Sequence, residues 1–116
     1  MRQKGIITMK KFDADYALLK DMYEDEYFPD FLVDKVKTRV QDVIALLETG
    51  EKNPKVIQSK FDDMTLAIND LQEEFEENDS EIETAARDSI GETVDYILKW
   101  FDIDIDVEDA IAKRDW

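Results

Sequence analysis

The fold of this chain is decided by residues 53–80, which read NPKVIQSKFDDMTLAINDLQEEFEENDS. Apolar side chains recur in this stretch every three or four residues, which is the spacing that places them on one face of an α-helix. Asn53 and Pro54 favour a helix start, because Asn caps helix N-termini and Pro suits the first helical position. The stretch therefore predicts one long amphipathic helix, with an inner face formed by Ile57, Phe61, Met64, Ile68, Leu71 and Phe75.

The same spacing upstream predicts two more helices. A first helix is expected over about residues 13–26, where apolar side chains form a narrow stripe, and Phe28-Pro29 ends it. A second is expected from Asp30, as its N-terminal cap, to a stop at Gly50. The inner positions are Phe12, Tyr16, Leu19 and Tyr23 in the first helix, and Leu32, Val33, Val36, Val40, Val43 and Leu47 in the second.

Downstream of the long helix, the sequence predicts a turn at residues 78–80 and then a fourth helix. Ser80 and Glu83 are spaced as a capping box, in which each side chain bonds a backbone N–H at the other position. Gly91 is expected to let a neighbouring helix approach this helix closely, and Asp106 with Asp109 is expected to start a short final helix over residues 107–113. The inner residues of the fourth helix are Ile82, Ala86, Ile90, Thr93, Val94, Ile97 and Phe101.

These helices predict an all-α fold, namely an antiparallel four-helix bundle with a short C-terminal fifth helix, because short turns join neighbouring amphipathic helices. A length of 116 residues suits a single domain spanning residues 1–116. Residues 1–10 precede the first apolar stripe and are expected to be loosely ordered. Trp116 is expected to fold back over the end of the bundle, since a large aromatic side chain gains much from burial.

Composition removes several classes of enzyme. The chain has neither histidine nor cysteine, so Ser-His and Cys-His nucleophiles are excluded, as are metal sites built on imidazole or thiolate. No cofactor is predicted. The apolar stretch at residues 5–9 is too short for the core of a signal peptide, and no apolar run approaches the length of a membrane span. A cytoplasmic protein that does not bind membranes is therefore expected.

The charge of the chain indicates what kind of partner can approach it. The net charge is −15, and residues 61–116 hold 19 acidic and 4 basic side chains, whereas residues 1–60 hold 11 of each. Such a field repels nucleic acid and anionic lipid, and it attracts basic proteins. Seven acids within residues 73–83 form either a solubilising surface or a docking surface. A second acidic cluster at residues 102–109, in the same half of the chain, supports docking.

Residues 23–31 interleave aromatic and acidic side chains. Aromatic rings beside carboxylates suit a contact site for an Arg- or Lys-rich partner, and they equally suit packing of the first helix on the second. We expect Tyr23, Phe28 and Phe31 to pack inward and Tyr27 to be exposed. The predicted partner-binding residues are Tyr27, Glu73, Glu74, Glu77, Asp79 and Glu81.

An alternative interpretation makes some of these acids a metal site. The spacing Glu73-Glu74-x-x-Glu77 followed by Glu92-x-x-Asp95 resembles the acidic motifs of all-α nucleoside triphosphate pyrophosphohydrolases, which hold Mg²⁺ between helices. Helical geometry counts against it, because Glu73 and Glu77 fall opposite the apolar stripe and Glu92 lies about 18 Å along the next helix. A solvated acidic face is the competing expectation for the same residues.

Three stretches resemble a family of small bacterial proteins of unknown function. They are Tyr-Phe-Pro-x-Phe-Leu-Val-Asp-Lys at residues 27–35, Leu-Gln-Glu-Glu-Phe-Glu-Glu at residues 71–77, and Arg-Asp-Trp at residues 114–116. The resemblance implies a bacterial, single-domain protein and supplies no activity. It gives the first and last of these stretches more weight than composition alone gives them.

The sequence thus predicts a non-catalytic acidic protein that docks a basic protein partner. An inhibitor or immunity-type protein that neutralises a basic toxin is the most specific form of this hypothesis, by analogy of charge and fold with acidic four-helix immunity proteins. The Mg²⁺-dependent pyrophosphohydrolase and a structural homodimer remain as alternatives. The chain is expected to be a monomer or a homodimer.

Overall fold

The structure, a computed structural model, describes residues 10–116. These residues form five α-helices and no strand, so the prediction of an all-helical chain is confirmed. Of the segment expected to be loosely ordered, residues 1–9 lie outside the described residues. Lys10 is held by a hydrogen bond from its Nζ to the carbonyl oxygen of Trp100 (2.7 Å). The helices are α1 (Lys20–Glu24), α2 (Asp30–Glu48), α3 (Pro54–Glu77), α4 (Thr84–Trp100) and α5 (Val107–Ala110).

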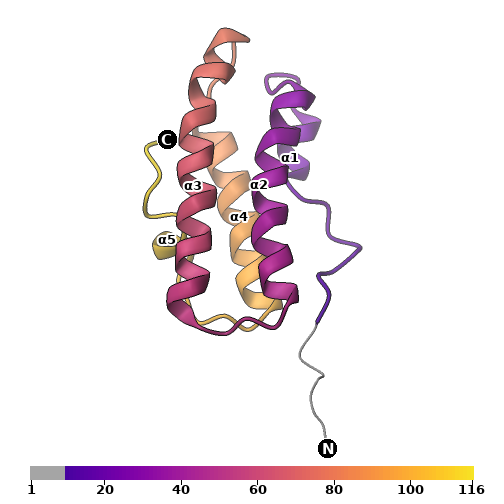
Figure 1. Ribbon diagram of the computed structural model, residues 1–116. Helices are drawn as coiled ribbons and strands as arrows, with labels where there is room; N and C mark the ends of the chain where they lie inside the picture. Colours follow the sequence, from indigo (N-terminus) through magenta and orange to yellow (C-terminus); the bar gives the residue numbers. More distant parts are fainter. Residues whose placement is uncertain (1–9) are drawn as a thin grey trace, which may run out of the picture.

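Three long helices alternate in direction along the chain (Figure 1). α2 and α3 are the pair in closest contact, and the turn at residues 49–53 joins them at one end. α4 returns from the opposite end of α3. The short α1 contacts α2 and α4, whereas the short α5 contacts α3 and α4. The described residues thus contain three long helices, where the sequence predicted four.

The predicted first helix over residues 13–26 is wrong for most of its length, because only Lys20–Glu24 is helical. Leu19 has a left-handed backbone (φ 56°), which a right-handed helix cannot contain, so α1 cannot extend upstream. Aromatic contacts with α4 hold the preceding segment instead, and the rings of Tyr16 and Tyr96 stack with their centroids 4.0 Å apart. The apolar stripe still faces inward, with Leu19 buried and Tyr16 half-buried.

α2 carries the apolar face expected of it. Its N-terminal cap is Pro29 and not Asp30, and Asp30 is the first helical residue, where a carboxylate favours the positive end of the helix dipole. Gly50 follows the helix with φ 88°, a left-handed conformation that glycine adopts without steric cost. All of the predicted inner residues are buried, namely Leu32, Val33, Val36, Val40, Val43 and Leu47.

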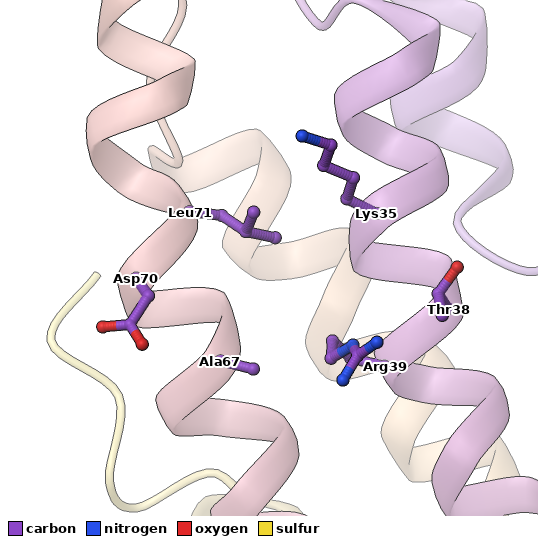
Figure 2. Close-up of a pocket in the computed structure, with 6 residues that line it drawn as sticks. All are labelled: Lys35, Thr38, Arg39, Ala67, Asp70 and Leu71. Carbon is purple, nitrogen blue, oxygen red and sulfur yellow. The ribbon is translucent and has the colours of Figure 1, made fainter.

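α3 begins as predicted, because Asn53 Oδ1 accepts a hydrogen bond from the backbone N–H of Lys55 (2.9 Å). Leu71 is the exception on its inner face, since it is half-buried and points toward α2 in Figure 2. The rest of the predicted face is buried, namely Ile57, Phe61, Met64, Ile68 and Phe75. The stretch that decides the fold in the sequence therefore forms the longest helix.

α4 begins at Thr84, and the predicted capping box is wrong. Ser80 Oγ makes no hydrogen bond, and Glu83 is itself the cap, because its carboxylate accepts from the N–H of Ala85 (3.3 Å). The expectation for Gly91 is also wrong, since a Cβ built there would meet no atom within 4 Å apart from its chain neighbours and the backbone of its own helix. The predicted inner residues are buried, namely Ile82 before the helix, Phe101 after it, and Ala86, Ile90, Thr93, Val94 and Ile97 within it.

The C-terminal segment returns along α3 and α4. α5 is shorter than the helix predicted over residues 107–113, and Asp106 precedes it without a side-chain capping bond. Trp116 is only 8% exposed, and its carbonyl oxygen accepts a hydrogen bond from Arg87 Nε (3.2 Å). Trp116 therefore folds back onto the helices, as the sequence predicted.

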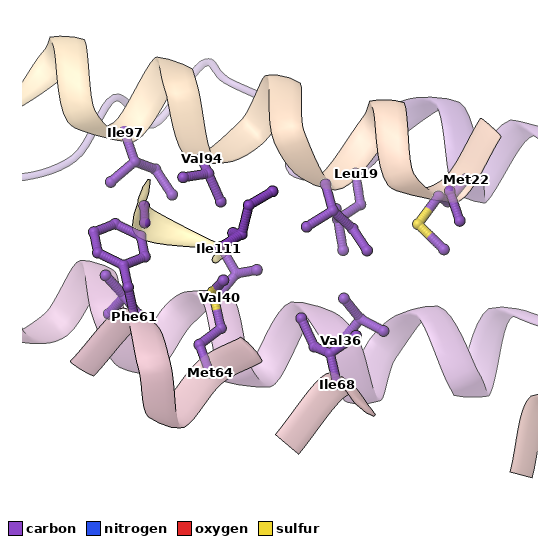
Figure 3. Close-up of a cluster of buried hydrophobic side chains, with 14 of the residues drawn as sticks. Leu19, Met22, Val36, Val40, Phe61, Met64, Ile68, Val94, Ile97 and Ile111 are labelled. Carbon is purple, nitrogen blue, oxygen red and sulfur yellow. The ribbon is translucent and has the colours of Figure 1, made fainter. Parts of the chain in front are cut away.

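The core lies between α4 on one side and α2 with α3 on the other (Figure 3). Leu19, Met22 and Ile111 fill the layer between them, and burial of such side chains stabilises the fold by about 1.5–3 kcal/mol each. Within residues 10–116, no helix has both the length and the apolar composition that a membrane span requires. Packing through this layer sets the long helices against one another. The C-terminal end of α3 and the turn after it carry most of the predicted site residues.

Candidate functional site

The turn between α3 and α4 forms a dense acidic surface, and we call residues 73–83 the acidic turn. Backbone hydrogen bonds close it, since the N–H of Ser80 donates to the carbonyl oxygen of Phe75 (2.9 Å) and that of Asp79 to the carbonyl oxygen of Glu76 (3.2 Å). Asp79 has φ 59°, the left-handed conformation typical of a residue that ends a helix. These bonds define the path of the backbone that carries the acidic side chains at the end of α3.

Tyr27 lies beside the acidic turn although it is far from it in the sequence. It lines a surface hollow of about 300 Å³ with Glu76, Asp79, Ser80 and Glu81, which we call the Tyr27 hollow. Its side chain is 41% exposed. Partial burial, followed by nearby carboxylates of which Glu81 acts most strongly, raises the pKa of the Tyr27 hydroxyl above its ordinary value. The structure thus brings together Tyr27, Asp79 and Glu81 of the predicted contacts.

The other aromatic residues near Tyr27 divide between core and surface. Phe28 is buried and Tyr23 is half-buried, as expected, but Phe31 is 48% exposed, so the expectation that it packs inward is wrong. The Tyr23 hydroxyl donates to Asp34, and burial together with this bond raises the pKa of that hydroxyl. The backbone N–H of Tyr27 donates to Asp25 Oδ1 (2.9 Å), which fixes the position of Tyr27.

A second hollow adjoins the first, and we call it the Trp116 hollow. It shares Glu76 and Glu81 with the Tyr27 hollow and has a similar volume of about 300 Å³. Asp115 and Trp116 contribute one part of its wall, and Arg87 is its only cation. Because Arg87 already donates to the Trp116 carbonyl oxygen, and Gln72 donates to the Asp115 carboxylate, the C-terminal segment is held in place.

Two buried polar atoms beside these hollows have no hydrogen-bond partner. Within residues 10–116, the side-chain atoms that combine burial with the lack of a partner are Ser80 Oγ and Trp116 Nε1. Ser80 lines the Tyr27 hollow, and Trp116 lines the Trp116 hollow. Buried polar groups are nearly always hydrogen-bonded, so two exceptions at one place are informative. The sequence pattern predicted a helix cap for Ser80 and a packing role for Trp116, and it did not predict these unpaired atoms. The Arg-Asp-Trp stretch at residues 114–116 was the feature of the sequence that drew attention to Trp116.

Three predicted contact residues lie on α3 outside both hollows. The carboxylate of Glu74 is paired with Lys35 Nζ on α2, at 2.7 Å from Oε2 and 2.9 Å from Oε1. Glu73 and Glu77, one helical turn apart, are exposed and line neither hollow. Glu74 therefore ties α3 to α2, whereas Glu73 and Glu77 present their charges to solvent.

The acids of the alternative metal site do not come together. Glu74 is paired with Lys35, and Asp95 Oδ2 is paired with Lys99 Nζ (2.8 Å) one turn further along α4. Across the part of the chain that the structure describes, no group of three or more carboxylates is placed to hold a metal ion. The predicted set of Glu73, Glu74, Glu77, Glu92 and Asp95 thus forms no ligand cluster among these residues.

The second acidic cluster lies away from the acidic turn. Residues 102–109 follow the C-terminal end of α4, whereas the acidic turn precedes its N-terminal end. The 17 residues of α4 separate the two clusters by roughly 25 Å at 1.5 Å per residue. The two clusters therefore do not form one docking face, although they lie in the same half of the sequence. The second cluster thus does not support docking at the acidic turn.

A groove between α2 and α3 is a further hollow on the surface (Figure 2). Its volume is about 330 Å³, with Ala67 and Leu71 on α3 facing Lys35 and Arg39 on α2. Both cations have carboxylate neighbours, because Lys35 pairs with Glu74 and Arg39 Nη1 lies 3.5 Å from Asp42 Oδ2. Asp70 is the one carboxylate among the lining residues and forms no ion pair with another described residue. The groove thus offers one unpaired carboxylate, whereas each hollow at the acidic turn gathers several.

Comparison with known proteins identifies the family. The model described as Family of unknown function (DUF5713) matches residues 12–116, a span that includes all five helices and both hollows. No curated protein and no solved structure matches the chain. The resemblance drawn from the sequence to a family of unknown function is thus confirmed. This chain belongs to the family of unknown function DUF5713.

Proposed function

We propose that this protein is a non-catalytic acidic binding protein that docks a basic protein partner through the acidic turn and Tyr27. An inhibitor or immunity-type protein that covers a basic surface is the most specific form of the proposal. The observation that carries it is the convergence of Tyr27 with the acidic turn, which sets an exposed aromatic ring among carboxylates. The proposed contacts are Tyr27, Glu73, Glu74, Glu77, Asp79 and Glu81.

The charges of the acidic turn support this proposal. Of its seven acids, Glu74 is the one that forms an ion pair with another of the described residues. The remaining carboxylates create a potential that reaches about 8 Å into solution at physiological ionic strength. Such a potential steers a basic partner and raises the association rate, while an exposed tyrosine supplies a well-defined contact.

We infer further that the protein works in the cytoplasm, as a monomer or a homodimer, without nucleic acid, membrane or cofactor. The net charge of −15 supports a protein that does not bind nucleic acid. The order and contacts of the five helices support an antiparallel four-helix bundle as the underlying architecture. In this arrangement α1 and the segment before it take the place of a full first helix.

A lysine nonapeptide with blocked termini serves as a basic probe of this proposal. We expect it to bind the wild-type protein with an affinity that falls steeply as NaCl is added. The variant Glu73→Gln/Glu77→Gln/Glu81→Gln removes three exposed charges from the acidic turn, and it should weaken binding about three- to tenfold, from a few tenths of a kcal/mol for each charge. Isothermal titration calorimetry at two salt concentrations measures both effects.

The control variant is Asp102→Asn/Asp104→Asn/Asp106→Asn, which removes the same charge beyond the other end of α4. Its affinity should stay within about twofold of the wild type. Equal losses in the two variants would place binding elsewhere, and insensitivity to salt would remove its electrostatic basis. Titration with Mg²⁺ and a panel of nucleoside triphosphates tests the non-catalytic part of the proposal, which turnover of any of them would overturn.

A further inference from the structure

We propose that the Tyr27 hollow is the anchoring pocket for an arginine side chain of the basic partner. This inference rests on the proposed function and deepens it, because it names the group that the acidic turn recognises. It distinguishes a built recognition site from a diffuse negative surface. The argument depends on the ring of Tyr27, on the carboxylates around it, and on the two buried polar atoms that lack partners.

The ring of Tyr27 is held in place while part of it stays exposed. It packs against the ring of Phe28 in an edge-to-face arrangement, with the centroids 5.2 Å apart and the planes at 71°, and Phe28 is buried in the core. The backbone N–H of Tyr27 is bonded to Asp25 Oδ1 (2.9 Å). A ring fixed in this way loses little freedom when a ligand packs on it, and a cation over an aromatic face is attracted electrostatically.

Carboxylates surround the ring within the same hollow. Glu76, Asp79 and Glu81 line it together with Tyr27, and none of the three forms an ion pair with another described residue. The pKa of the Tyr27 hydroxyl is raised first by burial and then by the charges of Glu81, Glu83 and Asp25. Several acceptors around one ring suit a cation that donates hydrogen bonds in several directions.

Ser80 and Trp116 supply the observation that points to a ligand. Ser80 is only 2% exposed, it lines the Tyr27 hollow, and its hydroxyl has no partner. Trp116 lines the adjoining hollow with an equally unpartnered indole N–H. A hydroxyl can accept a bond from a guanidinium N–H, and an indole N–H can donate to a backbone carbonyl of the segment that carries it. An arginine residue in a peptide offers both kinds of group.

Arginine fits this combination better than lysine does. Its guanidinium is planar, carries five N–H donors, stacks on aromatic rings and is weakly hydrated, whereas an ammonium is a compact and strongly hydrated charge with three donors. The carboxylates of Glu76, Asp79 and Glu81 and the hydroxyl of Ser80 provide more acceptors than an ammonium can use. A surface that acted only by its charge would treat the two cations alike.

Two blocked hexapeptides of equal charge test the inference, one alternating arginine with glycine and the other alternating lysine with glycine. We expect the arginine peptide to bind about three- to fivefold more tightly, measured by ¹H–¹⁵N NMR titration. The indole N–H signal of Trp116 should shift with the arginine peptide. That of Trp100 should not, because its Nε1 donates to the carbonyl oxygen of Lys11 (2.9 Å) at the other end of α4.

Variants identify the side chains that make the arginine peptide bind more tightly than the lysine peptide. Tyr27→Ala and Ser80→Ala should bind the two peptides equally, whereas Tyr27→Phe, which keeps the ring, should retain the preference. Phe31→Ala is the matched control, since Phe31 is an exposed aromatic residue that lines neither hollow. Circular dichroism of each variant confirms that it is folded, and Ser80→Ala should melt no lower than the wild type because it removes a hydroxyl without a partner.

The outcomes separate this inference from the proposed function. Equal binding of both peptides, lost together in high salt, overturns the arginine pocket and leaves electrostatic docking standing. Persistence of the arginine preference in Tyr27→Ala also overturns the pocket. Binding of neither peptide at low salt overturns the proposed function itself.

Discussion

At the scale of single residues, the sequence located charge and burial better than it located hydrogen bonds. Tyr27 was predicted from its position among acids, and it is exposed beside them. Ser80 was assigned to a cap because a Glu stands three residues after it, yet Glu83 caps α4 alone and the Ser80 hydroxyl stays unbonded. The bond that a buried hydroxyl makes depends on neighbours brought in by the fold, which local spacing does not contain.

Asp13 connects the N-terminal segment to α4 by a hydrogen bond with Tyr96. Tyr96 Oη donates to Asp13 Oδ2 (2.6 Å), and this bond, followed by one from the N–H of Asp15, lowers the pKa of the Asp13 carboxyl below its ordinary value of 3.8. A carboxyl with a lowered pKa stabilises the fold above its unfolded pKa and loses that contribution as the pH falls through the folded value. We therefore predict that Tyr96→Phe returns the Asp13 pKa toward 3.8 and loses less stability than the wild type on acidification.

Carboxyl ¹³C NMR titration measures the Asp13 pKa, and urea unfolding at neutral and acidic pH measures the stability. Tyr16→Phe is the control, because the ring of Tyr16 stacks on Tyr96 while its hydroxyl takes no part in the bond to Asp13. The same Asp13 pKa in wild type and Tyr96→Phe would show that the tyrosine hydroxyl does not set it.

At the scale of helices, the sequence predicted the long elements and misjudged the short ones. α2, α3 and α4 each bury a stripe that repeats over many turns, so the pattern alone specifies them. The first stripe is equally regular, but its aromatic residues Phe12 and Tyr16 pack on Tyr96 of α4 without forming a helix. Leu19 has a left-handed backbone, which a right-handed helix cannot contain, and α1 is limited to Lys20–Glu24. Tertiary contacts of this kind cannot be inferred from spacing.

Two glycines at different places in the helices provide a matched test of backbone effects. We predict that Gly91→Ala raises the free energy of unfolding by about 0.5–1 kcal/mol, because the position is helical and a Cβ there meets no atom within 4 Å apart from its chain neighbours and the backbone of its own helix. Gly50→Ala should instead lower it by about 1 kcal/mol, since φ 88° strains any residue with a Cβ. Urea unfolding of both variants measures the difference, and a loss of stability in Gly91→Ala would contradict the open space around that residue.

At the scale of the whole molecule, the acidic and neutral halves of the sequence correspond only in part to separate regions of the folded structure. The fold sets Tyr27, which belongs to the neutral half, beside the acidic turn, and Asp25 is among the charges that raise the pKa of Tyr27. It also moves residues 102–109, which belong to the acidic half, to the far end of α4. Composition was sufficient to predict that the site is acidic. Which residues form the site together depends on how the helices are arranged in space, and this could not be predicted from the sequence.

The same charge predicts how the stability of the molecule responds to salt. The carboxylates that give the chain its net charge of −15 repel one another in the compact state. The five ion pairs within residues 10–116 are largely exposed and contribute only about 0–1 kcal/mol each. Raising NaCl from about 10 mM to about 500 mM shortens the screening length from about 30 Å to a few ångströms. It therefore weakens the repulsion more than it weakens the pairs.

We accordingly predict that the midpoint of thermal unfolding rises by about 4–8 °C over that range of salt, which corresponds to roughly 1 kcal/mol for a domain of this size. The variant Glu73→Gln/Glu77→Gln/Glu81→Gln should melt higher than the wild type at low salt and gain less from added NaCl, because its repulsion is already reduced. Asp102→Asn/Asp104→Asn/Asp106→Asn, with the same net charge, should gain an intermediate amount, since those acids lie apart from the crowded end. A midpoint that falls with salt would mean that the ion pairs, and not the repulsion at the acidic turn, dominate the electrostatics of the fold.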